Sequence, residues 1–190
     1  MAGKMSRRTW LIVAILIIAV GTIVGIALSC NSSNPSDSTP QSDEALNFTL
    51  PTITGTNITL SELRGTLIIL NFWSISCYWC REQLPYIENV AQASGGVIEV
   101  IAANVVDSAT SVQDFFGDYD PAMIVALDEN SEVFADYCQK YDNLRGSIPF
   151  TFFIDSEGLV QYKRLGAFTS ETELWNTLQD VLGITIPETS

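Results

Sequence analysis

Hydrophobic and polar positions divide the chain into three parts: an apolar start, a short polar stretch, and a long mixed remainder from residue 46 to residue 190. In the remainder, continuous apolar runs alternate with longer segments in which apolar residues recur every three or four positions. Runs of the first kind are typical of strands buried in a central sheet, and segments of the second kind are typical of helices packed on that sheet. Residues 46–190 are therefore predicted to form one α/β domain.

The predicted order of strands and helices indicates a central mixed sheet flanked by helices. The predicted strands cover residues 66–73, 97–106, 123–127, 150–155 and 159–165, and the predicted helices run from the cysteine pair to residue 93 and over residues 110–117, 131–141 and 170–182. The first two strands enclose a helix and so form a parallel βαβ unit, whereas the last two are joined by a short turn and form an antiparallel hairpin. Two further short strands around Gly55 predict an N-terminal β-hairpin extension. At the last helix, Ser170 and Glu173 have the spacing of a capping box.

Residues 1–30 have the pattern of an export signal or a membrane anchor. Three basic residues, Lys4, Arg7 and Arg8, precede nineteen uncharged residues, Trp10–Leu28, which is about the length of one membrane crossing. The positive-inside rule then leaves the N-terminus in the cytoplasm and the rest of the chain on the extracytoplasmic face, either at the cell surface or in the periplasm.

The end of this apolar segment resembles a bacterial lipobox, the signal that directs lipidation of a cysteine. Cys30 follows Ala27-Leu28-Ser29, with alanine where such signals usually carry leucine. A lipoprotein anchored through Cys30 and an uncleaved single-span anchor both remain open, ahead of a free secreted form. Residues 31–45 are rich in serine, proline, asparagine and aspartate, a composition that predicts a flexible tether between the membrane and the folded domain.

The charge and composition of the exported part exclude several classes of partner. All 22 acidic residues follow Cys30, together with six of the nine basic ones, which gives this part a formal net charge of −16. Nucleic-acid binding needs a basic face, so no nucleic-acid partner is expected. The chain contains no histidine, which excludes Cys-His catalytic pairs, histidine-ligated metals and haem attachment at a CxxCH motif.

Cys77 and Cys80 are the residues of greatest chemical interest. They lie three positions apart, at the predicted junction between the buried strand 66–73 and the helix that follows it. The free N–H groups and the dipole at a helix start stabilise an anion, and Cys-x-x-Cys spacing lowers a thiol pKa from about 8.5 to between about 3.5 and 7.5. Cys77 is thus predicted to be a nucleophilic thiolate, and Cys80, one helical turn further on, the thiol that resolves a mixed disulfide.

Two other interpretations of the pair remain open. Half of a structural zinc site would need two more ligands, and the chain offers only Cys138 and the membrane-proximal Cys30, so no metal is expected. A purely structural bridge would close a very short loop, which removes little entropy from the unfolded chain. Redox chemistry is favoured over both, with the Cys77–Cys80 disulfide as the redox group and no bound cofactor.

The surroundings of the cysteines resemble those of the thioredoxin superfamily, and more closely those of the membrane-anchored TlpA/ResA-like thiol-disulfide oxidoreductases. The resemblance rests on segment 67–85, LIILNFWSISCYWCREQLP, and on the distant segment 146–155, GSIPFTFFID. It implies a thioredoxin-like fold in which Pro149 is cis and lies against the cysteine pair, with the Ile148 backbone turned toward an extended partner chain. The residues that it implies for substrate contact are Trp73, Tyr78, Trp79, Ile148 and Pro149.

Some positions depart from the pattern of the superfamily. Asn71 stands where thioredoxin has a buried aspartate, which favours the TlpA-like branch. Gln83 stands where ResA-like proteins often carry a glutamate, and the adjacent Glu82 projects away from both cysteines. No carboxylate is therefore identified to accept the Cys80 proton, and its removal is expected to depend on water or on the partner. Cys138 is expected to be a half-buried free cysteine rather than a third redox thiol.

The predicted function is that of a membrane-tethered, extracytoplasmic thiol-disulfide oxidoreductase. It is expected to reduce disulfides of exported proteins, for example in cytochrome c maturation, and to receive electrons from a donor in the membrane. One alternative is a thiol peroxidase of the peroxiredoxin type, for which Ser74 fits the motif but Leu70 replaces the required proline. The other is a non-enzymatic thioredoxin-like binding module, which would have no reason to retain both cysteines beside Ile148 and Pro149.

Overall fold

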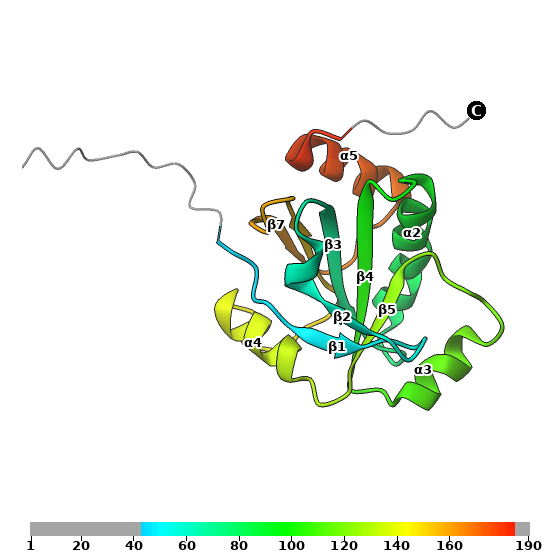
Figure 1. The fold of residues 1–190 in the computed structure, drawn as a ribbon. Helices are drawn as coiled ribbons and strands as arrows, with labels where there is room; N and C mark the ends of the chain where they lie inside the picture. The colour runs from blue at the N-terminus through cyan, green and yellow to red at the C-terminus, as the bar shows by residue number, and fades with distance from the viewer. Residues whose placement is uncertain (1–42, 185–190) are drawn as a thin grey trace, which may run out of the picture. The chain divides into compact units, whose positions relative to one another are not determined.

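The computed structural model describes residues 43–184. Its strands and helices, in chain order, are β1 (Thr49–Pro51), β2 (Asn57–Thr59), the 3-10 helix η1 (Leu60–Leu63), β3 (Leu67–Trp73), α2 (Tyr78–Ala93), β4 (Ile98–Val105), α3 (Ala109–Phe116), β5 (Ile124–Asp128), α4 (Glu132–Lys140), β6 (Phe150–Ile154), β7 (Val160–Leu165) and α5 (Glu171–Leu182) (Figure 1). Every strand and helix predicted for this range is present, and the predicted α/β fold is confirmed. The expected anchor and nearly all of the expected tether lie outside the described residues. Between residues 43 and 184, no helix is both long and apolar enough to span a bilayer.

β3 is the central strand of a five-stranded mixed sheet. The strand order is β5-β4-β3-β6-β7, in which β3, β4 and β5 are parallel and β6 is antiparallel to both β3 and β7. β3 has a neighbouring strand on each edge and packed residues on each face, so a nearly continuous apolar sequence suits it. Its one polar residue, Asn71, lies beside Thr151 of β6. The strand register therefore brings two polar side chains together in the middle of the core.

The sheet separates two hydrophobic cores. On one face, β3 residues such as Ile69 and Trp73 pack with residues of α2, α3 and α5. On the other face, Leu70 and Phe72 pack with residues of α4 and of the N-terminal segment, which Figure 1 shows together on one side of the sheet. These four side chains are fully buried, and complete burial of one large apolar side chain contributes about 1.5–3 kcal/mol. β3 thus stabilises both layers of the domain at once.

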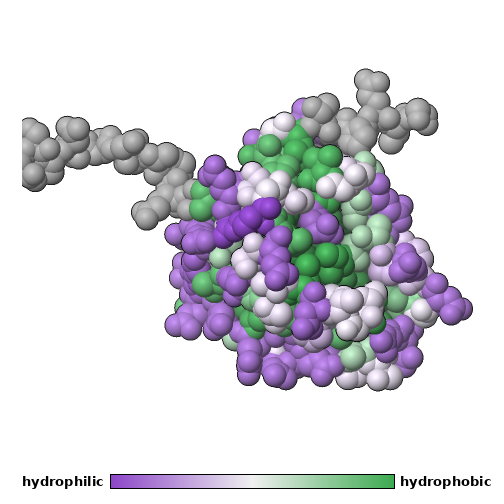
Figure 2. Space-filling model, viewed as in Figure 1, coloured by the Kyte–Doolittle hydropathy of each residue, from purple (hydrophilic) through white to green (hydrophobic). Residues whose placement is uncertain are grey.

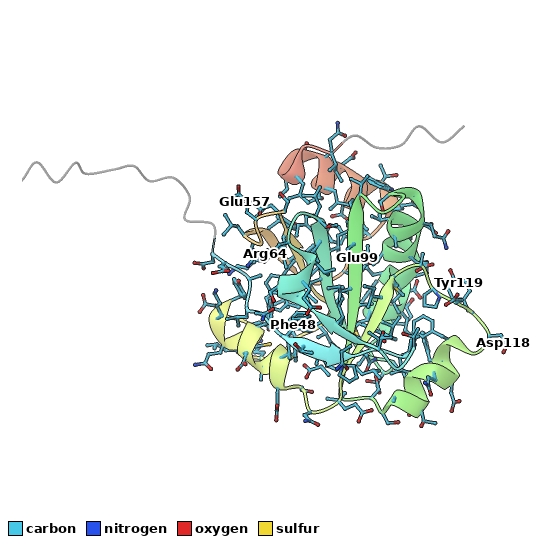
Figure 3. The ribbon with its side chains drawn as sticks, viewed as in Figure 1. Phe48, Arg64, Glu99, Asp118, Tyr119 and Glu157 are labelled. Atoms are coloured by element: carbon cyan, nitrogen blue, oxygen red, sulfur yellow. A yellow bond between two sulfur atoms is a disulfide. The ribbon has the colours of Figure 1, made fainter. Side chains whose placement is uncertain are left out.

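The described chain enters the domain beside the turn that joins β6 to β7. Ala45 is buried, and its N–H donates to the Gly158 carbonyl at 3.0 Å. Arg64, just before β3, donates to the Glu44 carboxylate at 2.6 Å and to the Glu157 carbonyl, and Figure 3 shows Arg64 beside Glu157. This turn lies at the end of the sheet where β3 begins. Glu44 and Ala45 are therefore packed on the domain at the end of the sheet remote from the cysteines.

β1 and β2 form the predicted N-terminal hairpin as a separate two-stranded antiparallel sheet. An isolated two-stranded hairpin is at best marginally stable in water, and this hairpin gains support from the open edge of β5. Thr52 forms a bridge with Ala126, and the Ile53 N–H donates to the Val125 carbonyl at 3.1 Å. The extension therefore covers an edge strand that would otherwise expose unpaired backbone groups.

The segment between β7 and α5 is fixed by a cap that differs from the predicted one. Ser170 Oγ accepts the Glu173 N–H at 3.1 Å, as in a capping box. The Glu173 carboxylate, however, accepts the N–H and the hydroxyl of Thr169 at 2.7 and 2.8 Å and pairs with Arg164 at 2.6 Å. The Thr169 N–H, followed by Arg164 and the Thr169 hydroxyl, lowers the pKa of Glu173 to about 2. These bonds hold the segment between β7 and α5 in a fixed conformation beside the N-terminal part of α2.

The surface combines an excess of negative charge with local apolar areas. Residues 43–184 include 20 of the acidic residues and six basic ones. Figure 2 shows hydrophobic side chains gathered in the middle of the near face, over the sheet, with hydrophilic ones around them. Such a surface repels acidic partners at long range and favours neutral or basic ones.

Candidate active site

Cys77 caps the N-terminus of α2. It follows the short loop after β3 and has an extended backbone, with φ −82° and ψ 107°, immediately before the first helical residue. Its Sγ atom accepts a hydrogen bond from the Cys80 N–H at 3.2 Å, in the place where a serine or aspartate oxygen caps most helices. A sulfur anion at this point receives a free N–H group and the positive end of the helix dipole, and both effects lower the pKa of a thiol.

Cys77 and Cys80 form a disulfide, with their Cα atoms 5.3 Å apart. The two sulfurs differ in accessibility. Cys80 is 1% exposed and belongs to the core between the sheet and α2, whereas Cys77 is only partly buried. A reactant from solvent therefore reaches Cys77 and not Cys80.

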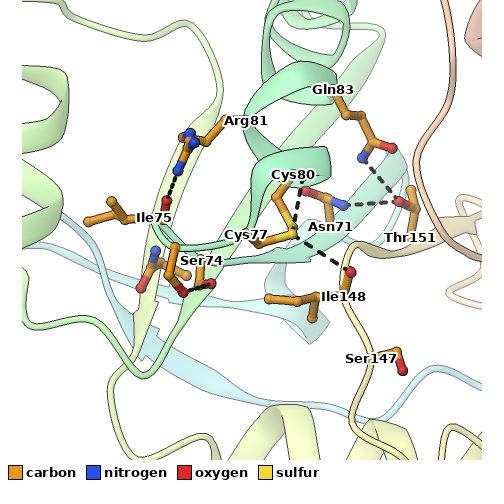
Figure 4. The surroundings of a disulfide bond; sticks show 12 residues. Asn71, Ser74, Ile75, Cys77, Cys80, Arg81, Gln83, Ser147, Ile148 and Thr151 are labelled. Carbon is orange, nitrogen blue, oxygen red and sulfur yellow. Dashed lines mark hydrogen bonds between the residues drawn. A yellow bond between two sulfur atoms is a disulfide. The ribbon is translucent and has the colours of Figure 1, made fainter.

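The loop before β6 lies against the disulfide (Figure 4). The Ile148–Pro149 peptide bond is cis, as the resemblance implied. The Ile148 carbonyl oxygen lies 3.7 Å from Cys77 Sγ, and because a disulfide sulfur carries no hydrogen, this approach is a contact and not a hydrogen bond. The Pro149 carbonyl accepts the Gly166 N–H at 2.9 Å, which links the loop to the segment between β7 and α5. Two distant parts of the chain thus converge on the cysteine pair.

The three aromatic residues expected to contact a substrate occupy different environments. Tyr78 and Trp79 are 55% and 62% exposed, and their rings meet edge to face at 5.1 Å. Trp73 is instead fully buried and packs against Phe115 and Phe116 of α3, with ring centroids 5.4 and 6.0 Å away. Its position corrects the expectation of direct contact, because Trp73 faces α2 and α3 from β3 and presents no surface to a partner. It supports the loop that carries Cys77.

A buried network of neutral polar groups lies beneath the pair (Figure 4). Asn71, Gln83 and Thr151 are all at most 1% exposed. The Thr151 hydroxyl oxygen accepts Asn71 Nδ2–H at 3.0 Å and, at 3.5 Å, Gln83 Nε2–H, while Gln83 Oε1 accepts the Phe168 N–H at 2.8 Å. Glu82, in contrast, is exposed. The sequence identified Asn71 and Gln83 as departures from the superfamily but missed Thr151, which only the pairing of β3 with β6 brings to them.

A clamp on the Ile75 peptide holds the loop before Cys77. The Ile75 N–H donates to Asp107 Oδ2 at 2.8 Å, and the Ile75 carbonyl accepts Arg81 Nη1–H at 2.6 Å. Asp107 follows β4 and also accepts Asn104 Nδ2–H at 3.0 Å. Asp107 was not among the residues predicted from the sequence, although a carboxylate just after a strand parallel to β3 is expected to lie near the end of β3. The clamp fixes the loop from both sides and so sets the direction of the Cys77 side chain.

Cys138 lies apart from the pair. It is a buried free cysteine of α4, in the core on the opposite face of the sheet from Cys80. Burial raises the pKa of the Cys138 thiol, with a smaller opposing effect of Asn143, so the thiol stays protonated and unreactive. Between residues 43 and 184, no cluster of three or more cysteine, aspartate or glutamate side chains has the arrangement of a metal site.

The start of α2 can stabilise the Cys77 thiolate, and solvent does not reach the neighbouring Cys80 thiol. This pair of thiols is suited to disulfide exchange through a mixed disulfide, in which one sulfur attacks and the other completes the reaction. Together with the thioredoxin-like sheet beneath it, the arrangement defines the class of the protein as a dithiol oxidoreductase.

Comparisons with known proteins identify the family. The model of the AhpC/TSA family matches residues 42–163, and the chain belongs to this family. Thiol-disulfide oxidoreductase ResA of Bacillus subtilis (strain 168) is 32% identical over 171 residues, which cover 87% of this chain and 89% of that protein. ResA of a Bacillus cereus strain is 30% identical over 129 residues, or 67% of this chain and 71% of that protein.

Solved structures agree with this assignment. A crystal structure described as a thiol:disulfide interchange protein DsbE from Chlorobium tepidum is 26% identical, with a TM-score of 0.64, and the match covers 75% of this chain and 97% of that one. The chain is therefore a thiol-disulfide oxidoreductase of the ResA type, and the resemblance read from the sequence is confirmed.

Replacing Asp107 with alanine should lower kcat/KM for reduction of a protein disulfide such as that of insulin by about tenfold, because small displacements of a reacting group have large kinetic effects. The cause would be the released Ile75 N–H and the freer Cys77 loop. Asp118→Ala, at an exposed position in the loop after α3 (Figure 3), is the control and should match the wild type. Wild-type kcat/KM in folded Asp107→Ala would show that the clamp is not needed.

Proposed function

We propose that this protein is a membrane-tethered, extracytoplasmic enzyme that reduces disulfides of exported proteins, with Cys77 as the nucleophile and Cys80 as the resolving thiol. The observation that carries the proposal is the unequal exposure of two bonded sulfurs at the start of α2. Only the sulfur of Cys77 is open to a large partner, and only it receives the stabilising N–H of the helix start.

The proposed reaction has two exchange steps. In the reduced protein, the Cys77 thiolate attacks one sulfur of the partner's disulfide; a bond forms between them, the partner's S–S bond breaks, and the other partner sulfur leaves and takes up a proton. Cys80 then loses its proton and attacks Cys77 Sγ, which forms the internal disulfide and releases the partner as a dithiol. The partner gains two electrons and two protons, and a donor in the membrane returns two electrons to the Cys77–Cys80 pair.

A groove beside the cysteines supports the assignment of Trp79 to partner binding. The groove has a volume of about 410 Å³ and is lined by Trp79, Glu82, Tyr86, Gly166, Ala167, Phe168 and Thr169. It runs between α2 and the segment that Gly166 joins to Pro149. We infer that the chain next to the partner's cysteine lies along Tyr78, Trp79 and the Ile148–Pro149 backbone, with apolar side chains in the groove. Glu82 at its wall favours a basic residue over an acidic one in that partner segment.

Replacing Cys77 with serine should reduce insulin-disulfide reduction to the uncatalysed rate, since a serine hydroxyl does not form the anion that attacks. Cys80→Ser should still attack but should stop at the mixed disulfide, which non-reducing mass spectrometry detects. Cys138→Ser is the matched control and should retain full activity. Full activity of Cys77→Ser would contradict the proposed roles.

The direction and the task of the reaction are tested by the redox equilibrium of the wild-type pair with glutathione. A reduction potential near −270 mV supports a reductant, and one near −120 mV would overturn that part of the proposal.

Reduction of a peptide with an oxidised CxxCH segment tests the cytochrome c task. Rapid consumption of hydrogen peroxide would favour a peroxidase instead, for which the fully buried Leu70 within β3 occupies the required proline position.

Trp79→Ala should lower kcat/KM for a protein disulfide by about tenfold, because truncating an exposed aromatic anchor removes on the order of 1–2 kcal/mol of partner contact. The rate with a small disulfide such as hydroxyethyl disulfide should stay within about twofold, since so small a substrate does not fill the groove. Leu144→Ala removes an apolar side chain that is 84% exposed elsewhere and should leave both rates unchanged. Equal losses for both substrates would place the role of Trp79 in chemistry and not in binding.

The membrane location rests on residues 1–45, whose composition predicts an anchor and a tether. Fractionation of cells that express the full chain should recover it with membranes, with its domain accessible to protease added from outside the cytoplasm. A mature N-terminus at Cys30 that carries a diacylglycerol group, detected by mass spectrometry, would identify a lipid anchor, and an intact N-terminal segment would identify an uncleaved span. Recovery of the wild type in the cytoplasm would contradict the proposed location.

A further inference from the structure

A buried acceptor without a partner lies next to the resolving cysteine. Asn71 is 1% exposed, and its Oδ1 atom accepts no hydrogen bond from any residue between 43 and 184. Its Nδ2 group does have a partner, because it donates to Thr151 Oγ1 at 3.0 Å. A buried carbonyl oxygen without a donor is destabilising, so such an atom in the centre of the domain requires an explanation.

The position of this oxygen relative to the disulfide suggests its donor. Asn71 lies between Ile69 and Trp73 on the face of β3 that meets α2, and Cys80 belongs to the same core. Figure 4 shows the Asn71 amide beside Cys80, with its nitrogen toward Thr151 and its oxygen on the side of the disulfide. In the disulfide form, Cys80 Sγ carries no hydrogen and can donate nothing to it.

We propose that Asn71 Oδ1 accepts the S–H hydrogen bond of Cys80 in the reduced protein, and that Asn71 thereby shifts the redox equilibrium toward the dithiol. When two glutathione thiols reduce the pair, the Cys77–Cys80 bond breaks, the S–S bond of glutathione disulfide forms, and two electrons pass to the enzyme sulfurs; one of the two thiol protons goes to Cys80, and the other goes to water when Cys77 is ionised. The proton on Cys80 Sγ then points to Asn71 Oδ1. The inference rests on the proposed redox role of the pair and adds to it a positioning residue.

The two forms of the protein differ in how well their buried polar groups are satisfied. In the oxidised form, Asn71 Oδ1 is unpaired; in the reduced form, the buried thiol and the buried oxygen satisfy each other. A thiol is a weak donor, so the gain comes mainly from relieving the unpaired acceptor. The same bond holds the proton on Cys80, while the Cys80 N–H stabilises negative charge on Cys77. Asn71 therefore favours the form in which the proton is on Cys80 and the negative charge is on Cys77.

The test is the equilibrium constant of the full chain with reduced and oxidised glutathione, measured for the wild type and for Asn71→Leu and Asn71→Ala. Both variants remove the acceptor from both redox forms, and each should shift the equilibrium toward the disulfide by about tenfold, equivalent to about 1.4 kcal/mol. Thr52→Ala, in the N-terminal hairpin, is the control and should leave the constant unchanged: Thr52 is also buried, and its hydroxyl donates to the Thr56 carbonyl at 3.1 Å. A role of Asn71 in folding alone would lower the stability of both redox forms equally and leave the constant unchanged, and that outcome would overturn the inference.

A second measurement needs no Asn71 variant. The infrared S–H stretching band that appears when the wild type is reduced, and that Cys80→Ser lacks, should lie at the lower frequency of a hydrogen-bonded thiol. A band at the free-thiol frequency would contradict the inference even if the Asn71 variants did not fold. Failure of the wild-type pair to exchange with glutathione at all would instead contradict the proposed function. The two kinds of failure are therefore distinguishable.

Discussion

The N–H of Cys80 bonded to the sulfur of Cys77 is the interaction on which the site depends. Through this hydrogen bond Cys77 acts as the N-cap of α2, so the residue that caps the helix is also the residue that reacts. Helix caps normally use an oxygen because oxygen accepts strong hydrogen bonds. A neutral sulfur is a poorer acceptor, and the cap becomes strong only when the sulfur is negatively charged. The stability of the helix start is therefore coupled to the ionisation of the nucleophile.

The central strand places everything else around that cap. Because β3 is buried on both faces, its register with β4 and β6 is fixed by packing, and the residues at its carboxyl end inherit that rigidity. Trp73, the last residue of β3, packs against α3, and Asp107, just after the parallel β4, holds the Ile75 peptide. A scaffold of this kind can hold a reacting atom closely, since Trp73 lies on a strand and Asp107 follows one within two residues.

Much of the fold, and the centre of the site, could be predicted from the sequence because their signals are local. Apolar runs and periodic segments predict the order of strands and helices. The Cys-x-x-Cys motif and the Ile148–Pro149 segment can each be recognised from a few consecutive residues. The supporting contacts could not be predicted in the same way. Asn71 and Thr151 are 80 positions apart, and Ile75 and Asp107 are 32 apart, so only the strand order brings each pair together. The burial of Trp73 could have been predicted, because strand alternation puts it on the same face as Ile69. The resemblance instead grouped it with the residues expected to contact a substrate.

The point where the described chain enters the domain has a consequence for how the protein would meet its reaction partners. Ala45 pairs with the turn at the beginning of β7, at the end of the sheet where β3 starts, whereas the cysteines follow the end of β3. The proposed tether would join the domain there, at the end opposite to the cysteines. Under the proposed function, a donor in the membrane must therefore reach the cysteines at the end of the domain opposite to the point where the proposed tether joins it. In that proposal, the length of the tether limits how far the cysteine end of the domain can turn toward the donor.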